Sequence, residues 1–120
     1  MAKRSTGELE AAVMRILWDQ GAWLTPGEVH RLLNDDALAY TTVMTILVRL
    51  WKKGRVERER DGRAYAYHAV LTREQYAAAR MEKVLAEAGD RPAALSLFLD
   101  VIDPGDRDQL RRLLKGHRAP

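Results

Sequence analysis

The stretch from Ala39 to Gly54, AYTTVMTILVRLWKKG, has the spacing of an amphipathic helix. At about 100° per residue, its aliphatic side chains cluster on one side of that helix. This side consists of Val43, Ile46, Leu47 and Leu50. Roughly opposite lie hydroxyl and basic groups with one valine among them, namely Thr41, Thr42, Thr45, Val48, Arg49 and Lys52. The pattern predicts a helix that buries one face in a core and offers the other to a partner.

The charge of this region favours an anionic partner. The segment from Leu38 to Val56 contains no acid, and residues 49–63 hold seven basic residues against three acids. That is a local charge of +4, compared with +3 for the whole chain. Threonine hydroxyls and the Arg49 guanidinium suit phosphates and base edges in a DNA major groove. An ordinary amphipathic helix with a solvated cationic face has the same pattern. The flanking sequence is therefore needed to distinguish a DNA-binding helix from an ordinary surface helix.

The length of 120 residues suits one domain, or a small domain with a helical appendage. The chain has no cysteine, which excludes disulfides and thiolate metal ligands and fits a reducing cytoplasm. No apolar run approaches the roughly 18 residues of a membrane span. The N-terminal MAKRSTGELE leads into a charged helical pattern and not into a signal peptide. We expect a cytoplasmic protein without membrane insertion.

Two helices are predicted ahead of Ala39. Ser5 followed by Glu8 has the pattern of a capping box, and Gly21 ends the helix that follows. Residues 22–24 suit a minor strand, and the sequence TPGE at residues 25–28 starts a short second helix. A short helix, a polar turn and a cationic, threonine-rich helix together describe a helix-turn-helix.

A basic β-hairpin is predicted directly after Gly54. Residues 55–60 and 63–69 have strand character, and Asp61-Gly62 supplies a two-residue turn between them. A hairpin behind a recognition helix is the wing of a winged helix, so we expect Arg60 and Arg63 at its tip to reach DNA. We expect Val56, Tyr65 and Tyr67 to seal the core.

The predicted fold class is therefore mainly α with a small β-hairpin wing. A winged helix-turn-helix domain would span residues 1–71, and a helical domain would span residues 72–120. The three short helices of the second domain cannot readily bury their apolar residues among themselves. A symmetric partner would cover them as a dimerisation arm; alternatively, they fold back on the winged helix of their own chain. The residues expected in a dimer interface are Tyr76, Leu85, Leu95, Phe98, Leu110, Leu113 and Leu114.

The chain resembles the penicillinase repressor family, winged-helix repressors that control β-lactamase and methicillin-resistance genes in bacteria. The segments that carry the resemblance span nearly the whole chain: GELEAAVMRILWDQG, LTPGEVHRLLN, AYTTVMTILVRL and KKGRVERERDGRAYAYHAVLTREQY. Its most specific part is AYTTVMTILVRL followed by KKG and DGRAY.

The resemblance implies a homodimer that binds a palindromic operator in double-stranded DNA and blocks transcription of β-lactamase-type or other stress and antibiotic-response genes. It places DNA contacts at Thr41, Thr42, Met44, Thr45 and Arg49, with the wing near Arg63 as support. Met44 lies at the edge of the outward face, where it would touch a thymine methyl group. The residues themselves, apart from the resemblance, add Lys52 and Lys53 by their charge and Arg60 by its place at the hairpin tip as phosphate contacts.

The resemblance also implies a sensor-protease partner, since in characterised members a membrane sensor-protease triggers cleavage within the dimerisation arm at an Asn-Phe bond. Alignment on Gly89-Asp90 places that bond at Leu97-Phe98, where the Phe matches and the Asn does not. A second branch of the family senses copper through cysteines, which this chain lacks.

Other classes of function fit the sequence less well. A winged helix for protein–protein assembly is one alternative, but it would favour an apolar or acidic recognition face. An enzyme is another, with acid clusters at Asp35-Asp36 and over residues 100–108. No histidine or cysteine lies near enough to complete a catalytic site. His30, His68 and His117 lack metal-ligand spacing, so we expect no metal and no cofactor.

Overall fold

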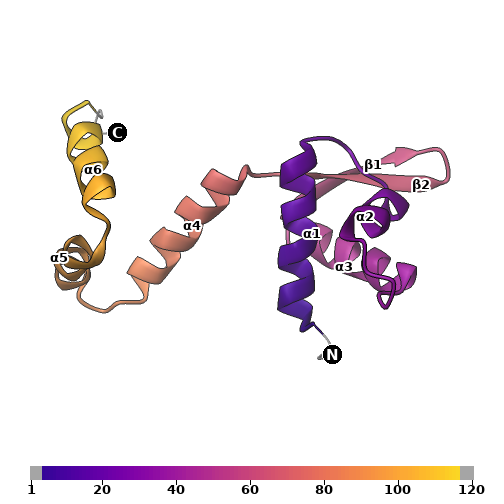
Figure 1. The fold of residues 1–120 in the computed structure, drawn as a ribbon, viewed down its shortest axis with the longest axis horizontal. Coiled ribbons are helices and arrows are strands. Elements are labelled where there is room, and N and C mark those ends of the chain that lie inside the picture. Colours follow the sequence, from indigo (N-terminus) through magenta and orange to yellow (C-terminus); the bar gives the residue numbers. More distant parts are fainter. Residues whose placement is uncertain (1–3, 117–120) are drawn as a thin grey trace. The chain divides into compact units, whose positions relative to one another are not determined.

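The structure is a computed structural model, and it describes residues 4–116. It divides into two compact units, residues 1–77 and residues 78–120. The elements labelled in Figure 1 are α1 (Thr6–Gln20), α2 (Pro26–Leu33), α3 (Tyr40–Lys52), β1 (Val56–Asp61), β2 (Ala64–Ala69), α4 (Arg73–Ala86), α5 (Arg91–Val101) and α6 (Pro104–Gly116). The described residues thus confirm the predicted fold class, mainly α with one β-hairpin.

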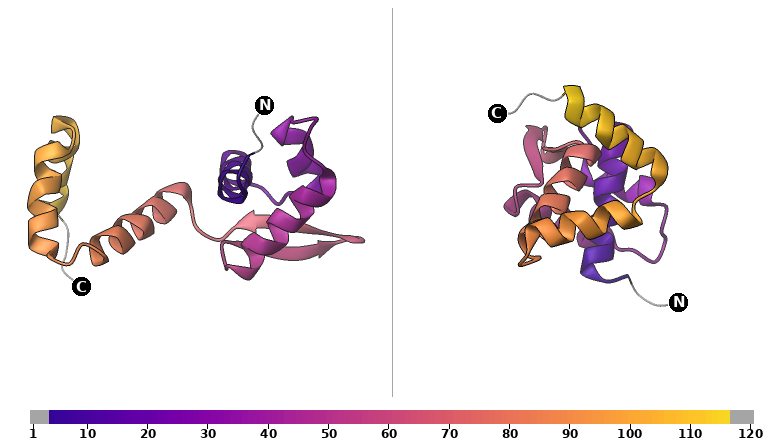
Figure 2. Two further views of the ribbon diagram at one scale, coloured as in Figure 1. Left: turned by 90° about the horizontal axis from the view of Figure 1, so that it is seen from below. Right: turned by 90° about the vertical axis from the view of Figure 1, so that its left-hand side faces the viewer.

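The core of the first unit lies between α1, α2, α3 and the hairpin. In Figures 1 and 2 the three helices gather on one side of the hairpin, whose tip projects beyond them. Its largest fully buried side chains come from all three helices and are Val13, Leu17, Val29, Val43, Leu47 and Leu50. The apolar face predicted for α3 is therefore buried as a whole, since Ile46 is also only 3% exposed.

The starts of α1 and α2 follow their capping signals. The Ser5 hydroxyl accepts from the amide of Glu8, and the Glu8 carboxylate accepts from the amide of Ser5. Thr25 and Glu28 form the same pair of bonds at α2. The amide and the hydroxyl of Thr25 both donate hydrogen bonds to the carboxylate of Glu28. These bonds hold the pKa of Glu28 below its ordinary value.

The hairpin pairs in the register Val56 with Ala69 through Asp61 with Ala64. Leu24 forms an isolated antiparallel bridge with Tyr67, so the expected minor strand is reduced to one residue pair. Val56 and Tyr67 are buried as predicted, but Tyr65 is 37% exposed. The prediction for Tyr65 was wrong because the hairpin extends past the core, so that the ring nearer the tip has no apolar layer beneath it.

The second unit has no side-chain core of its own among its described residues. Asp90 caps α5 by accepting from the amide of Ala93. None of residues 78–116 is buried, and several large apolar side chains there are more than half exposed: Met81, Val84, Leu97, Val101, Leu113 and Leu114. A domain of this size that buries so little of its apolar surface is not expected to be stable alone.

One ion pair ties the end of α3 to α1. The ammonium of Lys53, which directly follows α3, lies 2.8 Å from both carboxylate oxygens of Glu10. The Glu10 side chain is 7% exposed and the Lys53 side chain is 48% exposed. The described residues offer this carboxylate no second partner, so its burial depends on Lys53.

We predict an asymmetry between the two partners of this ion pair. Lys53→Met leaves a buried carboxylate without its cation and lowers the free energy of unfolding by about 2 kcal/mol. Glu10→Gln costs about 1 kcal/mol, because the amide oxygen still accepts from Lys53. Urea unfolding at neutral pH measures both, and the neighbouring Lys52→Met is the control. Equal stability of Lys53→Met and Lys52→Met would contradict a structural role for the pair.

Candidate nucleic-acid interface

Most of the outward face of α3 is open to solvent. Thr41, Met44, Thr45, Arg49 and Lys52 are exposed, and Thr42 and Val48 are half-buried. Because the opposite face is buried, the rotation of the helix about its axis is fixed and these side chains point away from the core. The helix therefore presents hydroxyl groups in its first half and cations in its second half.

The threonines of α3 do not offer identical chemistry. The Thr45 hydroxyl donates to the carbonyl of Thr41 at 3.0 Å, one turn back along the helix. Its proton is thus used within the helix, and the oxygen faces outward as an acceptor. No such bond engages the hydroxyls of Thr41 and Thr42 among the described residues. Thr45 is consequently suited to accept from a base amino group, whereas Thr41 and Thr42 remain able to donate to phosphate oxygens.

The start of α3 also differs from the starts of α1 and α2. Its N-cap residue, Ala39, makes no side-chain hydrogen bond, and its first turn contains no acid. The free amides of a helix N-terminus carry partial positive charge and can donate hydrogen bonds to an anion. In contrast to the two capped helices, α3 leaves this end available.

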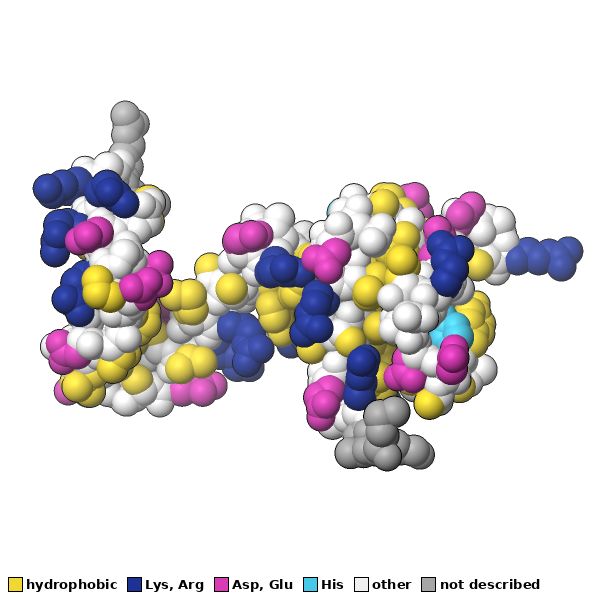
Figure 3. Space-filling model, viewed as in Figure 1, with side chains coloured by type: hydrophobic (Ala, Val, Ile, Leu, Met, Phe, Trp, Pro, Cys, Tyr) yellow, Lys and Arg dark blue, Asp and Glu magenta, His cyan; other side chains and the backbone are white. Residues whose placement is uncertain are grey.

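The hairpin separates its charges onto two faces. Residues alternate sides along a strand, so Arg58 and Arg60 lie on one face of β1 while Glu57, Glu59 and Asp61 lie on the other. The register places Tyr65 directly opposite Arg60, and the Arg60 guanidinium lies 5.5 Å from the centre of its ring. Basic side chains project at the hairpin tip in Figure 3. Arg63, in the turn beside this tip, is exposed.

Two residues predicted for binding surfaces have other partners in the structure. Lys53 is paired with Glu10, which neutralises its charge. Tyr76, expected in a dimer interface, lies in the first unit, where its ring centre is 5.5 Å from that of Trp18. The Arg55 guanidinium lies 4.8 Å from the Tyr76 ring centre. Neither contact is visible in local sequence patterns, since the partners are distant along the chain.

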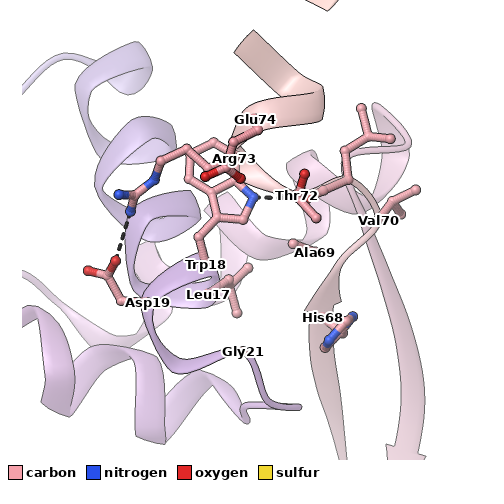
Figure 4. A pocket seen from close by; sticks show the side chains of 11 residues that line it. Leu17, Trp18, Asp19, Gly21, His68, Ala69, Val70, Thr72, Arg73 and Glu74 are labelled. Carbon is pink, nitrogen blue, oxygen red and sulfur yellow. Dashed lines mark hydrogen bonds and ion pairs between the residues drawn. The ribbon is translucent and has the colours of Figure 1, made fainter. Parts of the chain in front are cut away.

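The first turn of α4 is attached to the end of α1, as Figure 4 shows. The Trp18 indole donates to the carbonyl of Leu71 at 2.9 Å, and Arg73 pairs with Asp19 at 2.8 Å. A cavity of about 430 Å³ lies between these residues and the hairpin. Because Asp19 pairs with Arg73 and the Trp18 indole is bonded to Leu71, the polar groups that line the cavity already have partners, and we interpret it as a gap in the packing between α1 and α4. These contacts explain why the first compact unit continues to Ala77 rather than to residue 71.

The described part of the chain contains no cluster of histidine and acidic side chains that could hold a metal ion. His30 contacts the carbonyl of Leu38 at 2.7 Å, and His68 stacks on Trp23. The third histidine considered, His117, lies outside the described residues. No helix within residues 4–116 combines the length and apolar character needed to cross a membrane.

A helix-turn-helix followed by a hairpin with a basic face defines a winged helix-turn-helix protein. The family model for the penicillinase repressor matches residues 6–116. Two relatives from Mycobacterium tuberculosis, from strains CDC 1551 / Oshkosh and ATCC 25618 / H37Rv, are each named transcriptional regulator BlaI. Each is 44% identical over 124 residues, which cover 95% of this chain and 90% of the relative.

A solved structure agrees with these sequence matches. The solution structure of the DNA binding domain of the repressor BlaI is similar with a TM-score of 0.50 and 28% identity. The match covers 63% of this chain and 94% of that domain. The chain belongs to the penicillinase repressor family.

We predict that Tyr76 stabilises the winged-helix unit. Tyr76→Ala removes a ring from beside Trp18 and Arg55 and lowers the free energy of unfolding by about 1–2 kcal/mol. The change should also shift the indole proton resonance of Trp18, which NMR spectroscopy detects. Leu113→Ala, in α6, serves as the comparison and should leave that resonance in place. An unmoved Trp18 signal in Tyr76→Ala would show that the ring contact is absent in solution.

Proposed function

We propose that this protein is a transcriptional repressor that binds a palindromic DNA operator as a homodimer. The proposal rests mainly on the outward face of α3, which has no acid and carries three threonines, Arg49 and Lys52, together with the basic face of the hairpin. Membership of the penicillinase repressor family supports it, as does the likeness to the DNA binding domain of the repressor BlaI.

The division of roles follows from the chemistry of each side chain. Arg49 carries a planar fork of donors and would bind guanine, while Thr41, Thr42, Met44 and Thr45 would line the same groove. Exposed cations at the end of α3 and on the wing, Lys52, Arg60 and Arg63, would bind phosphates. Lys53 contributes less to DNA binding than these, because Glu10 already neutralises it.

The exposed apolar surface of the second unit supports a homodimer. A groove of about 620 Å³ runs between α4 and α5 and is lined by Met81, Val84, Leu85, Leu95 and Phe98. Further along, Leu110 is half-buried, and Leu113 and Leu114 are 53% and 73% exposed. Apolar side chains lie open along α4 and α5 in Figure 3. A second copy of the chain would cover this surface symmetrically.

The proposed mechanism of repression is steric. A dimer bound across a promoter would exclude RNA polymerase in the cytoplasm, and β-lactamase-type or other antibiotic-response genes are the proposed targets. A sensor-protease acting at Leu97-Phe98 would have to unwind α5, because this bond lies inside the helix and proteases prefer exposed, flexible chain.

The direct test is binding to the promoter duplex upstream of the protein's own gene, with a scrambled duplex as competitor. Specific binding by a dimer, weakened steeply by salt, would support the proposal. Equal affinity for both duplexes at moderate salt would refute sequence-specific repression.

Arg49 and Lys52 should differ in the kind of binding that they support. Arg49→Ala should lose about 1–3 kcal/mol on the specific duplex and much less on the scrambled one. Lys52→Ala should weaken binding to both duplexes alike. It should also reduce the slope of the logarithm of affinity against the logarithm of salt concentration by about one. Fluorescence anisotropy at several salt concentrations measures both effects. Equal losses on both duplexes for both variants would contradict the division of roles.

Leu95→Asp should disrupt the dimer. It places a carboxylate in the apolar groove of the second unit, where pairing would desolvate it, and should weaken self-association at least about tenfold. Sedimentation velocity measures the change, and Gln20→Asp on α1 provides the same charge outside the groove. An unchanged dimerisation constant in Leu95→Asp would remove this groove from the interface.

A further inference from the structure

Arg58, in the middle of β1, is held between two aromatic rings. Its guanidinium carbon lies 3.6 Å from the centre of the Trp51 ring and 4.1 Å from the centre of the Tyr65 ring. Trp51 is in the last turn of α3, and Tyr65 is a diagonal neighbour of Arg58 on β2. The stack therefore connects the recognition helix to both strands of the wing.

The edge of this guanidinium has no acceptor among the described residues. Arg58 is half-buried, yet no described residue forms a hydrogen bond or an ion pair with it. Stacking occupies the two faces of a guanidinium and leaves its N–H groups, which point outward in its plane, free to donate. The neighbouring acids, Glu57 and Glu59, lie on the opposite face of the strand. None of the Arg58 nitrogens is a buried atom without a partner, so the edge of the guanidinium is open to solvent and an acceptor from outside the chain can reach it.

The surroundings of Arg58 indicate what that acceptor is. Its face of the hairpin also carries Arg60, and Trp51 is followed directly by the exposed Lys52. These cations would attract an anion whose oxygens match the guanidinium fork, as those of phosphate do. A guanidinium fixed between two rings cannot extend into a groove to read a base, so a contact to the sugar–phosphate backbone fits better.

We infer that Arg58 is a phosphate-binding residue of the wing, held ready by Trp51 and Tyr65. The inference rests on the proposed DNA binding and assigns a residue that charge and helical spacing alone did not single out. Because the stack has already restricted the rotamers of Arg58, the contact costs less entropy than one made by a free arginine. The same stack holds the wing against the end of α3.

The test compares variants of the full chain on the promoter duplex and on a scrambled duplex across a salt series. Arg58→Ala should weaken binding to both by about tenfold and flatten the salt dependence by about one unit of slope. Arg58→Lys keeps the charge but loses the fork, so affinity should fall several-fold while the slope stays. Tyr65→Leu should weaken binding with the slope retained, and Tyr65→Phe, which keeps the ring, should match the wild type.

Arg15→Ala is the matched control, since Arg15 is exposed on α1 and removal changes the net charge equally. Affinity and slope for Arg58→Ala equal to those of Arg15→Ala would overturn the inference. If Arg58→Ala fails to fold, the test rests on Arg58→Lys and Tyr65→Leu. If both of these variants bind DNA with the same affinity as Tyr65→Phe, the role of Arg58 is overturned. If the wild type binds neither duplex, the proposed function itself fails, whereas wild-type binding with unaffected Arg58 variants rejects only the role of Arg58.

Discussion

The structure depends on the burial of one face of α3. Val43, Ile46, Leu47 and Leu50 are each at most 3% exposed, and burial of such side chains contributes roughly 1.5–3 kcal/mol apiece. A rotation of the helix by one residue, about 100°, would bury polar groups in their place and leave those groups without partners. The core therefore fixes which side chains of α3 meet the solvent, and the proposed DNA-binding surface is a consequence of the packing behind it.

The wing also has one face suited to an anion, because acidic and basic residues alternate along β1 and therefore lie on opposite faces of the strand. Acids on one face of β1 and arginines on the other allow only one face of the hairpin to approach an anion. The stack of Trp51, Arg58 and Tyr65 then sets that face beside the end of the recognition helix. The outward side of α3 and the basic side of the wing are thereby parts of one surface within the first unit.

Local patterns were sufficient to predict much of this from the sequence. Helical spacing identified the buried and outward sides of α3, and capping boxes located the two helices before it. The hairpin was also predicted, but its turn was placed one residue too early, because Asp61 pairs with Ala64 and leaves Gly62 and Arg63 as the two turn residues. The residues whose contacts differ from the prediction have partners that are far away along the chain. Lys53 meets Glu10 across 43 positions, and Trp18 meets the carbonyl of Leu71 across 53. No periodicity encodes such pairs, so the site of Tyr76 and the stacking of Arg58 required the structure.

We propose that the outward side of α3 and the basic side of the wing bind DNA together. An NMR titration of the full chain with its promoter duplex tests this most directly. The largest amide shifts are expected at Thr41, Thr45 and Arg49 and around residues 58–63, with small changes along α1. Shifts confined to residues 78–116, or spread evenly over the surface of the first unit, would contradict it.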